Sequence, residues 1–218
     1  MAEKKVFIAS NEGYYSEKII TYTYYSGFAV SQKQKCIRSL HEAIRAEFPD
    51  REILEVSTKS TDETGVKLSA FNLKFYHEEL QDYRWIENVF QSSKVFENGG
   101  PYRDLLDVSP KDAKRDERLK TSGRIIAFNL YGVDWPTEPK SMIYDWIYIT
   151  ALKKQTALAE AIMKYDIFTD IEFNHKRSIN CQARAAAIFV SLVRKNELEE
   201  KTASPEQFAT IYDAKSFL

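Results

Sequence analysis

Residues 85–101 read Trp-Ile-Glu-Asn-Val-Phe-Gln-Ser-Ser-Lys-Val-Phe-Glu-Asn-Gly-Gly-Pro, and they predict a short helix with three polar residues on one face. Glu87, Gln91 and Lys94 are spaced i, i+4, i+7, so in a helix of 3.6 residues per turn they fall within a fan of roughly 60°. The Gly-Gly pair supplies a left-handed stop, and the proline after it cannot continue the helix. A carboxylate, an amide and an ammonium would therefore share one surface. Spacing alone leaves open whether that surface faces water or a substrate.

The composition predicts one soluble globular domain over residues 1–218. Hydrophobic residues make up 44% of the chain and charged residues 29%, and the formal net charge is −1. A chain with so little net charge has no overall field to hold long nucleic acid through its phosphates, so any such contact must be local. The first residues lack the apolar run of a signal peptide, and nowhere do 18 apolar residues follow one another. We therefore expect a cytoplasmic protein with no membrane partner.

Cysteine and histidine usage argues against metal and disulfide chemistry. Cys36 and Cys181 are too few for a disulfide framework and lack the paired spacing of a zinc site, so both are expected to be packed thiols. His41, His77 and His175 form no cluster typical of a metal site or a triad. We expect no metal and no cofactor, which leaves carboxylates, lysines and hydroxyls to carry any chemistry.

Hydrophobic periodicity and turn signals predict an α+β fold weighted towards helix. A capping box at Ser31 is followed by apolar residues at helical spacing up to Phe48. A second helix should begin after Ser109, because a proline follows at the first helical position. Strands are expected over 6–9, 19–25, 53–57, 68–76 and 124–130, and helices over 31–48, 109–120, 140–154, 157–165, 180–198 and from residue 204.

Two groups of cations could bind anions. Lys33 and Lys35 lie in the first turn of a predicted helix, where the macrodipole disfavours positive charge and a bound phosphate would offset it. Lys114 and Arg115 belong to the basic segment 109–124, which also contains interleaved acids. The simpler interpretation is the same for both groups, namely solvated side chains that pair with neighbouring acids or extend into water.

Three further polar segments could reach a pocket. Lys59 lies in a Thr-Lys-Ser turn after a predicted strand, and Ser69-Ala-Phe-Asn72 could place polar groups at a pocket edge. Asp170 and Glu172 fall on the same side of an extended segment that precedes a polar loop, 175–177. Composition alone favours an ordinary loop there. The helix that begins near Asn180 contains four alanines within 183–187, which is typical of close packing in a core.

Several separated motifs occur together in this chain: Glu87-Asn-Val-Phe-Gln91-Ser-Ser-Lys94-Val-Phe96, Ser109-Pro-Lys-Asp-Ala-Lys-Arg115, Ser69-Ala-Phe-Asn72, Gly27-Phe-Ala-Val-Ser-Gln-Lys-Gln-Lys35, Ser57-Thr-Lys-Ser60, Phe168-Thr-Asp-Ile-Glu-Phe-Asn174 and Ser178-Ile-Asn-Cys-Gln-Ala-Arg184. Together, in their order along the chain, they resemble the NADAR family, the ADP-ribose-associated relatives of the YbiA-like N-glycosidases. They are most similar to the branch encoded beside DarT toxins. The Trp-Gly element of the YbiA-like branch is absent near residues 170–184.

The resemblance implies a DNA ADP-ribosyl glycohydrolase antitoxin that removes ADP-ribose from guanine bases. Its partners would be ADP-ribosylated DNA and, in addition, the cognate DarT toxin. Two other functions stay open: an antitoxin that neutralises the toxin by binding alone, and an N-glycosidase that acts on a ribosylamino-pyrimidine.

The resemblance also implies roles for named residues. Glu87 is the first choice for the carboxylate that faces the sugar, with Asp170 or Glu172 as the second. A desolvated lysine could instead attack the anomeric carbon, and Lys59 is preferred to Lys94 because Lys94 is expected to pair with Glu87. The remaining predicted contacts to substrate come from Lys33, Lys35, Ser69, Asn72, Trp85, Gln91, Lys114, Arg115 and Asn180.

Overall fold

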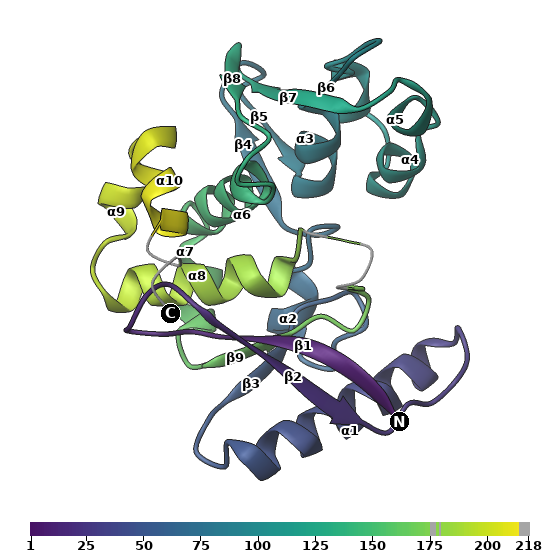
Figure 1. The fold of residues 1–218 in the computed structure, drawn as a ribbon, viewed down its shortest axis with the longest axis vertical. Coiled ribbons are helices and arrows are strands. Elements are labelled where there is room, and N and C mark those ends of the chain that lie inside the picture. Colours follow the sequence, from purple (N-terminus) through teal and green to yellow (C-terminus); the bar gives the residue numbers. More distant parts are fainter. Residues whose placement is uncertain (175–177, 179, 214–218) are drawn as a thin grey trace.

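The structure, a computed structural model, describes residues 1–174, 178 and 180–213, and it confirms the α+β prediction (Figure 1). Helices occupy more of the described chain than strands do. The polar loop predicted at 175–177 lies outside the described residues. In chain order the elements are β1 (Ala2–Ile8), β2 (Ser16–Tyr22), α1 (Val30–Glu47), β3 (Ile53–Glu55), α2 (Glu63–Lys67), β4 (Lys74–His77), β5 (Asp82–Trp85), α3 (Ile86–Ser92), β6 (Lys94–Phe96), the 3-10 helix η1 (Arg103–Leu106), α4 (Pro110–Arg115), α5 (Arg118–Thr121), β7 (Ile125–Leu130), β8 (Val133–Trp135), α6 (Met142–Lys153), α7 (Thr156–Ile162), β9 (Ile167–Thr169), α8 (Gln182–Arg194), α9 (Leu198–Lys201) and α10 (Pro205–Asp213).

A four-stranded sheet in the order β2-β1-β9-β3 lies between α1 and α8 (Figure 1). β1 pairs antiparallel with β2 and β9, whereas β3 and β9 run parallel. Side chains alternate between the two faces of the sheet because a strand has a period of two. Val6 and Ile167 pack in the cluster under α1, while their neighbours Phe7 and Phe168 pack in the main core with α8. The sheet is therefore covered on both sides.

Two buried helices, α6 and α8, form the centre of the main core. The alanine-rich stretch of α8, residues 183–187, is buried as the sequence predicts, and its one charged residue is buried with it. That residue, Arg184, donates to the Asp145 carboxylate on α6 at 3.0 and 3.1 Å, and the Tyr212 hydroxyl on α10 donates to the same carboxylate at 2.7 Å. A buried ion pair with these hydrogen bonds ties three helices together.

The segment around α3 forms the other half of the molecule, at the top of Figure 1. β6, β7 and β8 make an antiparallel sheet, and β4 and β5 make a hairpin that leads directly into α3. α4 and η1 pack beside α3. The chain enters this half with β4 and leaves it after β8, so residues from distant segments can meet where the halves face each other (Figure 1).

The prediction that one helix runs up to the glycine pair is wrong. α3 ends at Ser92, with Ser93 as its C-cap, and Lys94 begins a strand that pairs with β7. Tertiary pairing of this segment overrides its helical spacing. The glycines close the turn after the strand instead: Gly100 has φ 82°, and an added Cβ there would lie 2.5 Å from the carbonyl oxygen of Lys94.

Three other local predictions are also wrong. The capping box at Ser31 does not form, because α1 begins one residue earlier with Ala29 as N-cap and no side-chain cap hydrogen bond. The predicted strand 68–76 is mostly a tight turn in which Asn72 and Leu73 N–H donate to the Ser69 carbonyl at 2.8 and 2.7 Å, and only its end joins β4. The predicted helix 109–120 breaks at Asp116, whose ψ of 129° is not helical.

Candidate functional site

A cleft of about 630 Å³ opens between α3 and the segment that joins β9 to α8. One wall carries Glu87, Gln91 and Lys94, and the opposite segment contributes Asp170 and Glu172. Between them lie aromatic rings: Phe90 stacks on Phe128 with centroids 5.7 Å apart and meets Tyr144 edge-on at 5.2 Å. The cleft thus combines an apolar floor with polar groups at its walls, which is the usual make-up of a small-molecule or nucleotide site.

The polar face of α3 points into this cleft and forms a continuous hydrogen-bonded chain. The Lys94 ammonium donates to Gln91 Oε1 at 2.6 Å, and Gln91 Nε2 donates to Glu87 Oε1 at 2.8 Å. Glu87 is only 4% exposed, and Gln91 is likewise buried. Lys94 comes from the strand after the helix, so it reaches Glu87 through the Gln91 amide and not by the direct pair expected from helical spacing.

Burial changes the acid–base chemistry of Lys94, the lysine at the end of this hydrogen-bonded chain. It lowers the pKa of Lys94 to about 8, a shift that Glu87 opposes and Lys114 reinforces. The Lys94 ammonium also lies 4.8 Å from the centre of the Phe90 ring. About a tenth of such a group is neutral at pH 7, compared with a negligible fraction of an ordinary lysine. A neutral amine is the form that attacks carbon.

Lys114 on α4 places a second cation beside the same carboxylate. Its Nζ lies 3.7 Å from Glu87 Oε1 and 5.1 Å from the centre of the Phe71 ring. The Lys114 side chain is 56% exposed, whereas that of Glu87 is 6% exposed. The buried carboxylate therefore has a cation at the mouth of the cleft and an amide inside it, and both contacts suit its ionised form.

The opposite wall carries a carboxyl group with different properties. Asp170 accepts hydrogen bonds from the backbone N–H of Glu172 and Phe173 at 3.0 and 3.1 Å. Burial, with the neighbouring Glu55 carboxylate as the next cause, raises the pKa of Asp170 to about 7, although Lys4 opposes the shift. Asp170 can therefore hold a proton near neutral pH. Glu172 is exposed and pairs with Lys33 on α1 at 3.3 Å.

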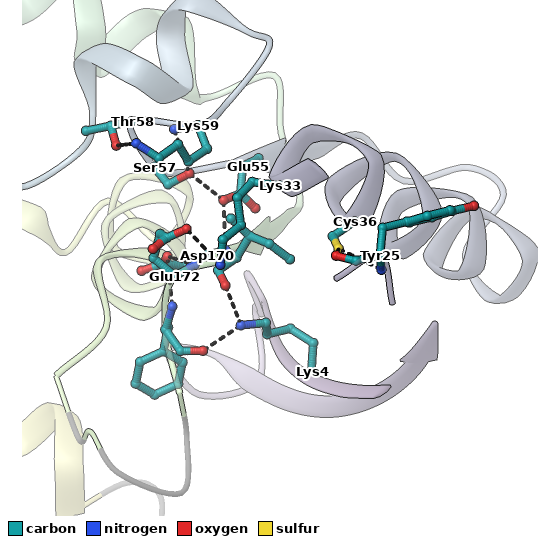
Figure 2. Close-up of polar contacts among 12 residues, drawn as sticks. Lys4, Tyr25, Lys33, Cys36, Glu55, Ser57, Thr58, Lys59, Asp170 and Glu172 are labelled. Carbon is teal, nitrogen blue, oxygen red and sulfur yellow. Dashed lines mark hydrogen bonds and ion pairs between the residues drawn. The ribbon is translucent and has the colours of Figure 1, made fainter. Parts of the chain in front are cut away.

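A buried network behind Asp170 holds this segment in place, and sequence reasoning missed it (Figure 2). The Glu55 carboxylate accepts from Ser57 Oγ and Thr169 Oγ1, both at 2.6 Å, and from the backbone N–H of Ile171 at 2.8 Å. Lys4 donates to the carbonyls of Ile171 and Phe173 at 2.9 and 2.5 Å. Glu55 gave a signal, because it is the one charge in the otherwise apolar strand β3, whereas Lys4 stands between Glu3 and Lys5 in β1 and gave none.

The comparisons with known proteins place the chain in a family. A family model described as the DarT1-associated NADAR antitoxin matches residues 2–217. The chain belongs to the DarT1-associated NADAR antitoxin family. None of the curated proteins matches it. Membership assigns it a DarT-associated antitoxin role, which points to a DarT toxin as its counterpart.

The structure of this NADAR family member separates the predicted site residues into two groups. The first group lines the cleft and consists of Glu87, Gln91, Lys94, Lys114, Asp170, Glu172 and Asn180. The second group is not among the described residues that line the cleft, and it consists of Lys33, Lys35, Lys59, Ser69, Asn72, Trp85 and Arg115. Lys59 donates to its neighbour Thr58 at 3.2 Å, and Lys33 is paired with the cleft residue Glu172 at 3.3 Å. Ser69 and Asn72 form the turn that presents the lining residues Ala70 and Phe71.

Asn180 and Gln182 differ in how their amides are used. Gln182 is fully engaged, since its Nε2 donates to the Val56 carbonyl at 2.6 Å and its Oε1 accepts from Ala70 N–H at 2.8 Å. The Oδ1 of Asn180 is buried in the cleft wall and finds no hydrogen-bond partner among the residues described. A buried acceptor without a donor is costly, so this atom is suited to a donor on a ligand.

Sequence reasoning also missed part of the cleft wall. Thr137, Glu138 and Lys140, which follow β8, also line the cleft. No local motif marks these residues, and only tertiary structure brings them to the site. Over the described ranges, no group of three or more His, Cys, Asp or Glu side chains could hold a metal ion, and no helix is long and apolar enough to cross a membrane.

Proposed function

We propose that this antitoxin is a glycohydrolase that removes ADP-ribose from guanine bases in DNA and so reverses the modification made by a DarT toxin. The single observation that carries the proposal is the chemistry gathered in one cleft. A lysine with a pKa of about 8 is linked through an amide to a buried carboxylate, and a carboxyl group with a pKa of about 7 lines the same cleft. The match to the DarT1-associated antitoxin family supports the choice of ADP-ribosylated DNA as the substrate class.

The bond to be cleaved joins the anomeric carbon of ribose to the exocyclic nitrogen of guanine. Protonation of the ring oxygen by Asp170 would open the ribose and leave a cationic imine between that carbon and the guanine nitrogen. Neutral Lys94 would then add to the carbon, and the guanine amine would leave with a proton. Water would hydrolyse the resulting lysine imine, release ADP-ribose as its aldehyde and restore the amine. Glu87 would stabilise the positive charge on the carbon throughout.

Lys94 replaces Lys59 as the preferred nucleophile for two reasons. Lys94 lines the cleft and has a pKa lowered by burial, whereas Lys59 bonds its neighbouring threonine away from the described cleft residues. Asp170 is likewise preferred to Glu172 as the second carboxyl group, because Glu172 is exposed and paired with Lys33. The mechanism requires no metal or cofactor. We also propose that residues 1–218 form one domain, since one family model spans 2–217.

Glu87→Gln tests the proposal. The new amide can still accept from Gln91, so the variant should fold, but it cannot stabilise a cation. We expect release of ADP-ribose from a guanine-modified oligonucleotide to fall by about a hundredfold or more. Glu63→Gln is the matched control, because Glu63 on α2 has a side chain that is 81% exposed.

Other outcomes would select the alternatives. Full activity of Glu87→Gln would remove this carboxylate from the mechanism. A Glu87→Gln protein that still protects cells and co-purifies with the toxin would identify an antitoxin that acts by binding. Turnover of a free ribosylamino-pyrimidine, with no release from modified DNA, would identify a small-molecule N-glycosidase.

A further inference from the structure

The loop between β2 and α1, residues 23–29, exposes three aromatic rings. Phe28 is 100% exposed, Tyr24 is 51% exposed and Tyr25 is 40% exposed. Single exposed apolar residues are common on protein surfaces, but three rings within five residues form a patch that suggests a partner. We call residues 23–29 the aromatic loop.

The backbone of the aromatic loop is anchored although its rings are exposed. Tyr25 N–H donates to the Cys36 sulfur at 3.2 Å, and the Cys36 thiol lies 3.3 Å from the Tyr25 carbonyl (Figure 2). Thr23 N–H donates to Ser39 Oγ at 3.0 Å. Both anchors lie on α1. The loop is therefore held against a long helix, and less conformational freedom is lost when a ligand covers the rings.

The segment that contains the aromatic loop and the start of α1 is basic, although the chain as a whole carries a net charge of −1. Residues 23–41 contain Lys33, Lys35 and Arg38 and no Asp or Glu. Lys35 and Arg38 are exposed and lie three residues apart, so they share one face of α1. Lys33 is paired with Glu172, and Glu3 also lines the neighbouring groove, so the cations offered to a ligand are Lys35 and Arg38. Exposed rings next to these two exposed cations fit a ligand that has both flat π-faces and phosphates.

A groove of about 690 Å³ connects the aromatic loop to the catalytic cleft. Tyr24, Lys33, Glu172 and Phe173 are among the residues that line the groove. Glu172 and Phe173 also line the cleft, so the two depressions share this wall. Lys33 bridges to Glu172 at 3.3 Å and thereby joins α1 to the rim of the cleft. An extended ligand that leaves the cleft at this rim would run towards the aromatic loop.

We propose that the aromatic loop and its groove bind the unpaired nucleotides that flank the modified guanine in single-stranded DNA. Flanking bases would stack on Tyr24 and Phe28, and their phosphates would lie near Lys35 and Arg38. Stacking requires unpaired bases, so the surface favours a single strand over a duplex. This inference rests on the proposed function, because it assigns the substrate of that cleft as an oligonucleotide and not as a free nucleotide.

The test compares two substrates of different size. Tyr24→Ala/Phe28→Ala removes two exposed rings and should not affect folding, and Tyr83→Ala removes a ring that is 49% exposed on the distant β4-β5 hairpin. Each protein is assayed on a single-stranded 12-mer with a central ADP-ribosylated guanine and on ADP-ribosylated guanosine monophosphate. We expect kcat/KM of the double variant to fall by about tenfold or more on the 12-mer and to stay within about twofold on the mononucleotide. Tyr83→Ala should match the wild type on both.

A second measurement separates failure of this inference from failure of the proposed function. Fluorescence anisotropy with a labelled, unmodified 12-mer should show weaker binding by the double variant even if the wild type releases ADP-ribose from neither substrate. Equal losses on both substrates, or unchanged kinetics and unchanged anisotropy, would overturn the inference. Unchanged DNA binding with loss of toxin co-purification would also overturn it and would assign the loop to a protein partner.

Discussion

The pH dependence of catalysis follows directly from the two groups with shifted pKa values. The mechanism needs Asp170, with a pKa of about 7, in its protonated form, and Lys94, with a pKa of about 8, in its neutral form. Activity should fall below pH 7 as Lys94 becomes more fully charged, and it should fall above pH 8 as Asp170 loses its remaining proton. The expected profile of kcat/KM is therefore a bell centred at about pH 7.5.

The size of the effect can be worked out from the same values. At pH 7.5 about a quarter of Asp170 is protonated and about a quarter of Lys94 is neutral, so about 6% of the enzyme is in the productive state. One pH unit to either side the productive fraction falls about 2.5-fold, and two units away it falls about 20-fold. Release of ADP-ribose from a guanine-modified oligonucleotide, measured between pH 5.5 and 9.5 at constant ionic strength, gives the profile.

A variant is needed to assign the two limbs, because the opposite protonation states would produce a bell of the same shape. Asp170→Asn cannot donate a proton, so its residual activity should rise through pH 8 and then level off, without the alkaline fall. A flat wild-type profile between pH 6 and 9 would refute the assignment. Loss of the acidic limb in Asp170→Asn, with the alkaline limb intact, would refute it as well.

Two further predictions concern lysines. Sodium borohydride added during turnover should trap an ADP-ribose adduct on the wild-type chain and on Lys59→Arg, detected by intact-protein mass spectrometry. Lys94→Arg should show no adduct, and an adduct on that variant would exclude Lys94 as the nucleophile. Lys4→Met leaves two buried carbonyls without their donor, so it should lower the free energy of unfolding in urea titrations by about 2–3 kcal/mol. The control Lys5→Met removes a partly exposed pair with Glu17 and should lower it by less than about 1 kcal/mol. Equal effects of the two variants would contradict the role given to Lys4.

Local spacing was enough to bring Glu87 and Gln91 together, because both lie on one helix four residues apart. It could not place Lys94, since the change from helix to strand after Ser92 depends on pairing with β7. Nor could spacing show that the polar face of α3 is buried. A helix of seven residues can be covered on all sides by neighbours that its own sequence does not specify.

The second half of the site depends on contacts between residues far apart in the chain. Lys4 reaches carbonyls 167 and 169 residues away, and Glu55 binds a backbone N–H 116 residues away. The pKa of Asp170 follows from this burial and from the Glu55 charge, so no local pattern could predict it. The charge of Glu55 in the apolar strand β3 was a visible signal, and such residues are worth treating as candidates for buried networks in related sequences.

Release of ADP-ribose from modified DNA tests the central claim most directly. Single-stranded oligonucleotides of one sequence, modified either on guanine or on thymine, are incubated with the wild-type chain, and free ADP-ribose is measured by mass spectrometry. The account predicts rapid release from the guanine-modified strand and little from the thymine-modified strand, because only guanine provides an exocyclic amine that can leave from the opened sugar. No release from either strand, or equal release from both, would contradict it.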